Sequence, residues 1–379
     1  MVYKAVAKGK LSDSPMTAEI EIAGRRIGPD HPPYVICELS GNHNGSLDRA
    51  LAMIDAAAAT GCDAIKIQTY TADTITMDID RPEFRIRGGL WDGRSLHDLY
   101  LEAQTPYEWH PALFARAAAS GVTLFSSPFD ETAIDLLDGL NAPAFKIASF
   151  EAIDLPLIAY AAGRGKPLII STGMANLAEI TAARETALAA GAPGVVLLHC
   201  VSSYPAALED ANVRTVADMA QRFDCPIGLS DHTPGTAASV VAIALGACVI
   251  EKHFTLARAD GGPDAAFSLE PSEFRQLVAD CKAAWTALGR AHYDLLGSEK
   301  ANRQFRRSLY VNADIAAGTI LTREHVRSIR PGNGLPPANL ARVLGRVAAR
   351  DLVRGEPLSW DMLERVPISG NRLSEQNTL

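Results

Sequence analysis

The feature that most constrains the fold is a unit that recurs eight times between residues 34 and 253. Each unit begins with a short apolar run, continues through a polar or glycine-containing turn, and in many cases leads into an amphipathic, alanine-rich segment. Continuously apolar strands that alternate with helices are typical of a parallel sheet buried on both faces. Eight such units favour a closed (β/α)8 TIM barrel over an open, doubly wound sheet. The runs are YVICE, AIKIQ, VTLFS, AFKIA, PLIIS, VVLLHC, PIGLS and CVIEKH.

The pattern divides the chain into five predicted segments. Residues 1–30 are an N-terminal extension, 31–290 the barrel, 291–306 a linker, 307–367 a small second domain and 368–379 a tail. The second domain is predicted because the pattern changes after the linker to short elements with repeated Gly, Pro and Arg. We expect residues 1–30 and the tail to be loosely ordered. The long interval between Thr69 and Val122 should contain an extended loop before its helix.

Composition excludes several classes of protein. A formal net charge of -8 argues against a nucleic-acid-binding surface. No apolar stretch reaches the length of a membrane span, and the first residues lack the apolar run of a signal peptide. We therefore expect a cytoplasmic protein with no membrane or nucleic-acid partner. Its six cysteines form no CxxC pair and should be reduced, small core residues.

Two lysines in the predicted strands point to an anionic ligand. In barrel enzymes the chemistry lies at the carboxyl ends of the strands, and here nearly every run ends in polar residues. Lys66 lies in the second run and Lys146 in the fourth. Burying a lysine in a barrel strand is costly without an anionic partner, so the pair suggests a doubly charged ligand. Serines at neighbouring strand ends offer neutral donors to phosphate oxygens. For either lysine alone, a salt bridge to a carboxylate is the alternative.

Two histidines indicate a candidate metal site. His232 and His253 end consecutive runs, and therefore lie on adjacent strands of the predicted barrel. Neutral imidazoles in this arrangement could both bind one divalent metal and leave positions open for water and substrate. The alternative for each is a packed, hydrogen-bonded histidine. His199, inside an apolar run, is as well explained by a structural role as by a functional one.

Two glutamates also lie at strand ends. Glu38 and Glu251 could act as general acid or base, or accept hydrogen bonds from sugar hydroxyls. They could equally be the partners of Lys66 and Lys146, and both interpretations can hold together. Because side chains alternate along a strand, Lys66 should share a face with Gln68, and Glu251 with His253. Asp231 should then point away from His232, which favours a supporting role over metal binding.

Longer motifs at the strand ends carry a resemblance to a known family. They stand in order as ELSGNHNGSLDRAL, DAIKIQTYTADT, LFSSPFD, FKIASFE, LIISTGMA, LLHCVSSYP, IGLSDHT and VIEKHFTL. In order and spacing they resemble the sialic acid synthase family, the phosphoenolpyruvate-dependent nonulosonic acid synthases. The later motifs IAAGTILTREHV and IRPGNG resemble that family's antifreeze-like (SAF) domain. Within the family, ELSGNHN, QTYTADT and GGPDAAFSLEP most resemble the pseudaminic acid synthases.

The resemblance implies a role for each candidate residue. His232 and His253 would bind Mn²⁺ or a similar ion such as Mg²⁺ or Co²⁺, and Glu251 would lie near the carbon that water attacks. Arg330 would reach the sugar from the partner subunit of a domain-swapped homodimer. Ser202 stands where N-acetylneuraminate synthases commonly have Asn, which supports a different sugar. Phosphoenolpyruvate would be held by Lys66, Ser127, Lys146, Ser149, Ser171 and Ser230. The sugar would contact Glu38, Asn42, Gln68, Tyr70, Ser202, Tyr204 and Arg330.

The expected activity is therefore a carbon–carbon bond-forming transferase. It would condense phosphoenolpyruvate with 2,4-diacetamido-2,4,6-trideoxy-L-altrose and water to give pseudaminic acid and phosphate, with Glu38, Glu251, Lys66 and Lys146 as the catalytic residues. The same reaction in an N-acetylneuraminate or legionaminic acid synthase is the nearest alternative. A Schiff-base aldolase that uses Lys66 or Lys146 as nucleophile is more distant, and a non-catalytic binding protein is the alternative from another class.

Overall fold

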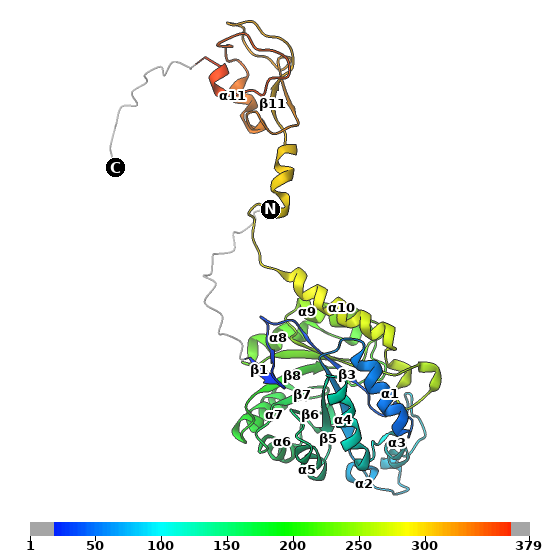
Figure 1. Cartoon of the computed structure of the whole chain (residues 1–379). Helices are drawn as coiled ribbons and strands as arrows, with labels where there is room; N and C mark the ends of the chain where they lie inside the picture. The colour runs from blue at the N-terminus through cyan, green and yellow to red at the C-terminus, as the bar shows by residue number, and fades with distance from the viewer. Residues whose placement is uncertain (1–18, 365–379) are drawn as a thin grey trace, which may run out of the picture. The chain divides into compact units, whose positions relative to one another are not determined.

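The computed structural model describes residues 19–364, which fall into two compact units that divide after Gly289 (Figure 1). The parts of the predicted N-terminal extension and tail beyond these residues lie outside the described range. No helix within residues 19–364 is long and apolar enough to cross a membrane. Each unit is described by itself below.

The first unit is built on a closed barrel of eight parallel strands in the order β10-β3-β4-β5-β6-β7-β8-β9. Each strand pairs with the next one along the chain, and β10 closes the barrel onto β3 with His253 opposite Glu38. The eight predicted runs are the eight strands, which confirms the predicted fold class. The strands are β3 (Tyr34–Glu38), β4 (Ala64–Thr69), β5 (Thr123–Pro128), β6 (Phe145–Ile147), β7 (Leu168–Ser171), β8 (Val195–Cys200), β9 (Ile227–Asp231) and β10 (Val249–His253).

A ring of helices surrounds the strands (Figure 1). Several begin at residues whose side chains cap the helix N-terminus, such as Ser46, Asp130 and Asn176. Their buried faces and the outward side chains of the strands form one apolar layer. The helices are α1 (Leu47–Ala58), α2 (Ala72–Ile75), α3 (Leu96–Ala103), α4 (His110–Ala119), α5 (Glu131–Gly139), α6 (Leu155–Ala162), α7 (Leu177–Ala189), α8 (Arg214–Arg222), α9 (Ala237–Ala244) and α10 (Pro271–Leu288).

The expectation of loose order for residues 1–30 is wrong for the part that the structure describes. Residues 20–27 form a hairpin of β1 (Ile20–Ile22) and β2 (Arg25–Ile27). Ile20, Ile22 and Ile27 are buried in one cluster with Tyr34 and with inward side chains at the amino ends of the strands. The hairpin is ordered because it covers apolar surface that the open end of the barrel would otherwise expose to water.

The interval between β4 and β5 is more structured than the predicted extended loop. It contains α2, the 3-10 helix η1 (Pro82–Phe84) and a short hairpin. In the hairpin, the Ile86 N–H donates to the Arg94 carbonyl and the Gly93 N–H donates to the Ile86 carbonyl. Then follow α3, the 3-10 helix η2 (Tyr107–Trp109) and α4. Thr71 begins α2 with a capping box in which its hydroxyl accepts from the Thr74 N–H.

Alternation along the strands divides the barrel interior into an apolar floor and a polar upper layer. The floor contains Ala64, Phe125, Ala144, Ile169 and Val249. Two residues further along their strands stand Lys66, Ser127, Lys146, Ser171 and Glu251. Because successive side chains point to opposite faces, these residues share the interior with the floor beneath them. The polar layer therefore lies at the carboxyl ends of the strands, above a packed core.

The second unit has its own small core. Its antiparallel pair, β11 (Ser308–Val311) and β12 (Val326–Ile329), packs with the short helix α11 (Leu340–Val343). Leu309, Val311, Ile315, Leu321 and Leu358 are among the buried side chains that form this core.

Candidate active site

Lys66 is the centre of the first group of contacts in the polar layer. Its Nζ lies 3.1 Å from Glu38 Oε2 and 3.1 Å from Glu251 Oε1, and it donates to Ser127 Oγ at 3.3 Å. Gln68, on the same face of β4, donates from Nε2 to Glu38 Oε1 at 2.9 Å. The predicted alternation along β4 is confirmed, and Glu38 is a partner of Lys66, as one of its two interpretations expected. Its role as general acid or base, or as acceptor from a sugar, stays a prediction.

Lys146 lies on the other side of Glu251. Its Nζ donates to Ser171 Oγ at 2.6 Å and stands 3.7 Å from Glu251 Oε1. Ser230 Oγ donates to the same carboxylate oxygen at 3.2 Å. Within residues 19–364 the other oxygen, Glu251 Oε2, is buried without a hydrogen-bond partner. Four predicted residues from four strands, Lys66, Lys146, Ser171 and Ser230, thus meet around the Glu251 carboxylate, which keeps an unused polar atom available to a ligand.

The two glutamates have opposite electrostatic environments. Burial raises the pKa of Glu251, but the ammonium groups of Lys146 and Lys66 outweigh it and hold that pKa at about 2. Burial raises the pKa of Glu38 above its ordinary value despite the nearby Lys66. Burial also lowers the pKa of Lys146 to about 8, since Glu251 compensates only in part. Environments that push two carboxyl pKa values apart are common where proton transfer is carried out.

Ser149, Ser202 and Gly173 meet beside this cluster. Ser149 lies just beyond β6, and its Oγ accepts from the Gly173 N–H at 3.2 Å. A Cβ on Gly173 would overlap Ser202 Oγ and approach Ser149 Oγ to 2.8 Å. Glycine is therefore required here by the close approach of two hydroxyl groups. Ser149, Gly173 and Ser202 thus meet where strands β6, β7 and β8 end.

The two candidate metal ligands face each other. The ring centroids of His232 and His253 lie 5.3 Å apart. His232 donates from Nδ1 to the Val201 carbonyl at 2.9 Å, so its Nε2 carries the free lone pair. His253 Nδ1 is buried without a hydrogen-bond partner in the described chain, and burial lowers the pKa of this imidazole well below its usual range. The pKa of His232 is instead raised, because its contact with Cys200 outweighs the effect of burial. Two imidazoles that both present an unused nitrogen, once deprotonated, fit a divalent metal.

Among the residues that the structure describes, no third strong protein ligand completes a metal site with the two histidines. Within residues 19–364, no group of three His, Cys, Asp or Glu side chains is arranged to hold a metal. Asp264 Oδ2 lies 3.9 Å from His253 Nδ1, and Cys200 Sγ lies 3.8 Å from His232 Nδ1. Such a site would hold a metal weakly and leave coordination positions for water and substrate.

Sequence reasoning missed two loop residues near the histidines. Asp264 and Phe267 lie in the loop after β10, and the Phe267 ring is 4.9 Å from that of His253. The ring of the predicted residue Tyr204 packs against two others, with its centroid 4.5 Å from that of His232 and 5.3 Å from that of Phe267. The motif GGPDAAFSLEP contained both missed residues, but a loop has no periodicity that shows which side chains turn inward.

Glu151 is a further residue that the sequence did not single out. It lies two residues beyond Ser149, its Oε2 has no hydrogen-bond partner among the described residues, and burial raises the pKa of its carboxyl to about 7. Lys146 lies close enough to attract this carboxylate. The sequence offered one sign of this residue: in FKIASFE, Glu151 follows Lys146 closely, just past the end of the same strand.

Three residues predicted to bind the sugar lie outside this network of contacts. Asn42 is buried and donates from Nδ2 to the Phe254 carbonyl at 2.8 Å and to Ser268 Oγ at 2.9 Å. Tyr70 is buried and packs edge-on against Phe129, with ring centroids 5.1 Å apart. Arg330 is exposed at the end of β12 in the second unit. Contact of these residues with a sugar stays a prediction.

Other conspicuous polar residues have structural partners. His199 donates from Nε2 to the Ala211 carbonyl at 2.8 Å, which supports the structural interpretation. Asp231 points outward as predicted and pairs with Lys252, a third buried strand lysine, at 2.9 Å. Lys252 therefore carries no anion-binding role, because its charge is neutralised between the strands and the helices.

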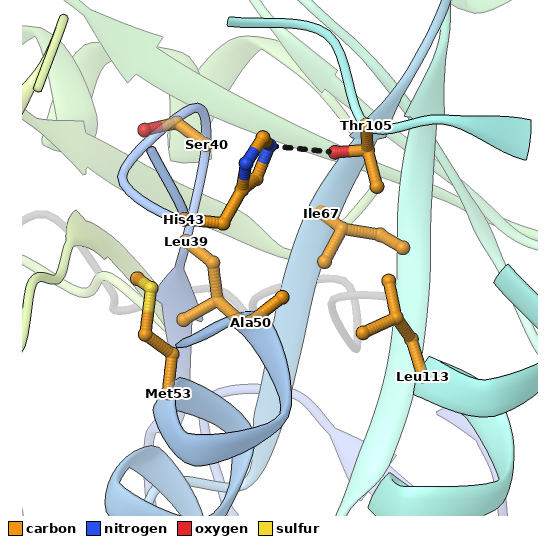
Figure 2. A pocket seen from close by; sticks show the side chains of 8 residues that line it. All are labelled: Leu39, Ser40, His43, Ala50, Met53, Ile67, Thr105 and Leu113. Atoms are coloured by element: carbon orange, nitrogen blue, oxygen red, sulfur yellow. Dashed lines mark hydrogen bonds between the residues drawn. The ribbon is translucent and has the colours of Figure 1, made fainter. Parts of the chain in front are cut away.

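His43, in the motif SGNHN, lies beside a small cavity outside the polar layer (Figure 2). Its Nε2 lies 3.4 Å from Thr105 Oγ1, and the other lining side chains are mostly apolar, including Met53 and Leu113. Burial lowers the pKa of His43 to about 4, which keeps the ring neutral. Figure 2 shows His43 and Thr105 side by side above the apolar side chains. We therefore interpret His43 as a support of the loop after β3.

Comparison with known proteins finds relatives that match most of the chain. The sequence model of the NeuB family matches residues 53–293, and that of the SAF domain matches residues 306–364. The pseudaminic acid synthase of Campylobacter jejuni strain 81-176 is 44% identical, over 87% of this chain and 96% of its own length. That of Helicobacter pylori is 40% identical, over 88% and 98%. The N,N'-diacetyllegionaminic acid synthase of Legionella pneumophila is 34% identical, over 87% and 94%.

Solved structures show the same relationship. The crystal structure of an N-acetylneuraminic acid (sialic acid) synthetase from Leptospira borgpetersenii, in complex with citrate, is 31% identical and has a TM-score of 0.68. The match covers 76% of this chain and 95% of that one. A 3-deoxy-D-arabino-heptulosonate 7-phosphate synthase from Thermotoga maritima, at 16% identity and a TM-score of 0.56, shares the fold.

Proposed function

Because the chain belongs to the NeuB family, we propose that it is a pseudaminic acid synthase that condenses phosphoenolpyruvate with 2,4-diacetamido-2,4,6-trideoxy-L-altrose and water. The products are pseudaminic acid and phosphate. The observation that carries this proposal is the buried cluster in which Lys66 and Lys146 flank Glu251 beside His232 and His253. The choice of sugar is supported by the higher identity to named pseudaminic acid synthases than to named legionaminic acid synthases.

The lysines and serines bind phosphoenolpyruvate. Lys66 and Lys146 provide two positive charges for its carboxylate and phosphate, and Ser127, Ser171 and Ser230 already lie within hydrogen-bond distance of the lysines or Glu251. Ser149 adds a hydroxyl from the β6 end. Binding orients the reactive methylene carbon toward the histidine side of the cavity, which converts a two-molecule encounter into reaction at close range.

Carbon–carbon bond formation takes place beside His232 and His253. These residues would hold a divalent ion such as Mn²⁺, Mg²⁺ or Co²⁺, which when bound would polarise the aldehyde oxygen of the open-chain sugar. Glu38, fixed by Gln68, accepts hydrogen bonds from the sugar hydroxyls. The methylene carbon of phosphoenolpyruvate bonds to the aldehyde carbon, and the aldehyde oxygen takes up a proton from solvent, which is returned when water later adds to the enol carbon.

The second half of the reaction consumes water. Positive charge develops at the enol carbon, and Glu251, held ionised by the flanking lysines, stabilises it. Water adds to that carbon while Glu251 or Glu38 accepts the released proton. The bond between this carbon and the phosphate oxygen then breaks, phosphate leaves with the electron pair, and the keto group of the sugar acid forms.

A homodimer with exchanged second domains is also proposed. Phe150, Ile153, Met174 and Leu177 follow β6 and β7 on the rim of the cavity, and each is 49–65% exposed. Apolar side chains grouped at one rim suit a protein contact, and the partner's second unit would bring its own Arg330 to the sugar. The six free cysteines fit a reducing compartment, and we place the reaction in the cytoplasm.

Phosphate release tests the proposed function directly. The full chain is assayed with phosphoenolpyruvate and one of three sugars. These are 2,4-diacetamido-2,4,6-trideoxy-L-altrose, the sugar precursor of legionaminic acid, and N-acetylmannosamine. Each assay is run with and without EDTA. We expect release with the first sugar at the highest kcat/KM, and its loss in EDTA with recovery on adding Mn²⁺. Absence of phosphate with all three sugars would contradict the proposal.

A Schiff-base aldolase remains the alternative with a specific observation in its favour. Burial lowers the pKa of Lys146 to about 8, which makes a neutral amine more accessible than usual. Borohydride added during turnover would trap an imine on Lys146 if this mechanism operates. We expect no covalent adduct by intact-mass measurement, since Lys146 is committed to Ser171 and Glu251.

A further inference from the structure

The hairpin between α2 and α3 contains a tryptophan for which the reaction described above has no role. Ile86 donates its N–H to the Arg94 carbonyl at 2.9 Å, and Gly93 donates to the Ile86 carbonyl at 2.9 Å. Trp91 stands near the tip of this hairpin. Its neighbour Leu90 is 48% exposed, whereas Trp91 is partly buried. A large aromatic side chain that turns inward from an exposed hairpin tip calls for an explanation.

Two contacts fix the position of the Trp91 ring. The indole N–H donates to the Pro263 carbonyl at 2.9 Å, and Pro263 directly precedes Asp264. The ring centroid lies 5.8 Å from that of Tyr204, at a tilt of 49°. Trp91 therefore joins the hairpin after β4 to the loop after β10, beside Tyr204, whose ring packs against His232.

The contacts run in a definite order across the site. Lys146 and Glu251 stand at one side, and His253 follows Glu251 on the same face of β10. Tyr204 packs against His232, and Trp91 packs against Tyr204. Phosphoenolpyruvate belongs to the lysine side and the aldehyde to the histidines. The part of the sugar that reaches past the imidazoles then meets the ring of Tyr204 and, beyond it, that of Trp91.

We infer that Trp91 is a specificity-determining residue that packs against the end of the acceptor sugar remote from its aldehyde. This inference rests on the proposed function. An indole face offers apolar contact and no hydrogen-bond acceptor, so it favours a terminal methyl group over a hydroxymethyl group, whose hydroxyl would lose its hydrogen bonds to water. Trp91 thus selects for sugars that lack the oxygen on their last carbon.

A pair of sugars that differ at one atom tests this selection. The acceptors are the 6-deoxy diacetamido sugar and its 6-hydroxy analogue of the same stereochemistry, each assayed by phosphate release at saturating phosphoenolpyruvate. The variants are Trp91→Ala, which removes the ring, and Trp91→Phe, which keeps an apolar ring without the indole N–H. Leu90→Ala, on the same hairpin, is the matched control.

We expect Trp91→Ala to lower kcat/KM for the 6-deoxy sugar by about 10- to 200-fold. The 6-hydroxy analogue should be affected much less, so the preference for the 6-deoxy sugar declines toward unity. Trp91→Phe should keep most of the preference, and Leu90→Ala all of it. The KM for phosphoenolpyruvate should not change in any variant, because Trp91 lies away from the lysines. If Trp91→Ala does not fold, Trp91→Leu takes its place.

Other results would overturn the inference in distinguishable ways. Equal losses with both sugars, or a parallel rise in KM for phosphoenolpyruvate, would mean that Trp91 only supports the loops. A preference that survives in Trp91→Ala would also contradict its role, while leaving the proposed function intact. Wild-type enzyme that releases no phosphate with either sugar would contradict the proposed function, and the inference with it.

Discussion

At the scale of single residues, the site depends on Glu251, whose carboxylate lies between two ammonium groups. Glu251→Gln keeps the shape of the side chain but removes the negative charge that stabilises the enol carbon. We expect kcat to fall by about 10²- to 10⁴-fold. Circular dichroism should remain that of the wild type. The exposed Glu185→Gln is the matched control and should retain wild-type kcat. Near-normal turnover of Glu251→Gln would remove Glu251 from the mechanism.

Glu151 makes the stability of the protein depend on pH. Burial raises the pKa of its carboxyl to about 7, whereas in the unfolded chain the group ionises near its ordinary pKa of about 4.3. Between these values the unfolded chain has lost a proton that the folded chain keeps. The stability that the protonated Glu151 contributes is therefore fully present below the pKa of the unfolded chain. It is lost as the pH rises through the pKa of the folded protein. The free energy of unfolding should fall by on the order of 2 kcal/mol across this window.

Urea unfolding at a series of pH values from about 5 to about 8 measures how much stability the protonated Glu151 contributes, because this range includes the pKa of the folded protein. Glu151→Gln cannot ionise, so its free energy of unfolding should decline less over the same range than that of the wild type. Glu185→Gln should follow the wild type. Identical pH dependence in the wild type and Glu151→Gln would show that Glu151 is ionised in the folded protein at low pH.

Residue-level prediction succeeded where a strand fixed the direction of the side chain. Lys66 and Gln68 share the barrel interior because side chains alternate with a period of two. The sequence could not place Tyr70, which follows the end of β4, or Trp91 and Asp264, which lie in loops. The inward direction of these side chains depends on contacts between segments far apart in the chain. No local pattern encodes such contacts.

At the scale of elements, an outward-facing ion pair links the two strands that carry the histidines. Lys252 on β10 lies 2.9 Å from Asp231 Oδ2 on β9 and donates to the Thr233 carbonyl at 2.6 Å. Ser239 of α9 donates to the same carboxylate at 2.6 Å. Asp231 directly precedes His232, and Lys252 directly precedes His253. The pair therefore fixes the relative position of the two strands that carry the proposed metal ligands.

Asp231→Asn should destabilise the fold by about 3–5 kcal/mol, because it leaves the buried Lys252 ammonium without an oppositely charged partner. The double variant Asp231→Asn/Lys252→Met removes both charges and should recover part of the loss. Asp218→Asn breaks an exposed pair with Arg222 on one helix and should leave stability almost unchanged, because solvent screens exposed pairs. Urea unfolding compares the three variants. Equal stabilities for Asp231→Asn and Asp218→Asn would contradict the account.

The order of the barrel elements was predictable from the sequence, because continuous apolar runs alternate with amphipathic segments. The hairpin of β1 and β2 was not, since three-residue strands with mixed charges give no recognisable period. The same holds for the hairpin around Trp91. Short elements are stabilised by the surface they cover, and that surface is visible only in the folded molecule.

At the scale of the whole molecule, the barrel has one end devoted to stability and the other to chemistry. Ile22 in the N-terminal hairpin is fully buried beneath the strands, whereas Val241 on α9 is 46% exposed. Ile22→Ala should lower the free energy of unfolding by about 2–5 kcal/mol. Its KM for phosphoenolpyruvate should not change. Val241→Ala should have little effect on either quantity. An Ile22→Ala protein of wild-type stability would show that the hairpin does not close the barrel.

The central claim is that Lys66, Lys146, Glu251, His232 and His253 face one cavity that holds both reactants. X-ray diffraction from crystals soaked in Mn²⁺ and phosphoenolpyruvate tests it most directly, because anomalous scattering locates the metal independently of the protein atoms. We predict one anomalous peak within bonding distance of both imidazoles, with phosphoenolpyruvate against the two lysines. A metal bound elsewhere, or phosphoenolpyruvate bound away from Lys66 and Lys146, would contradict the account.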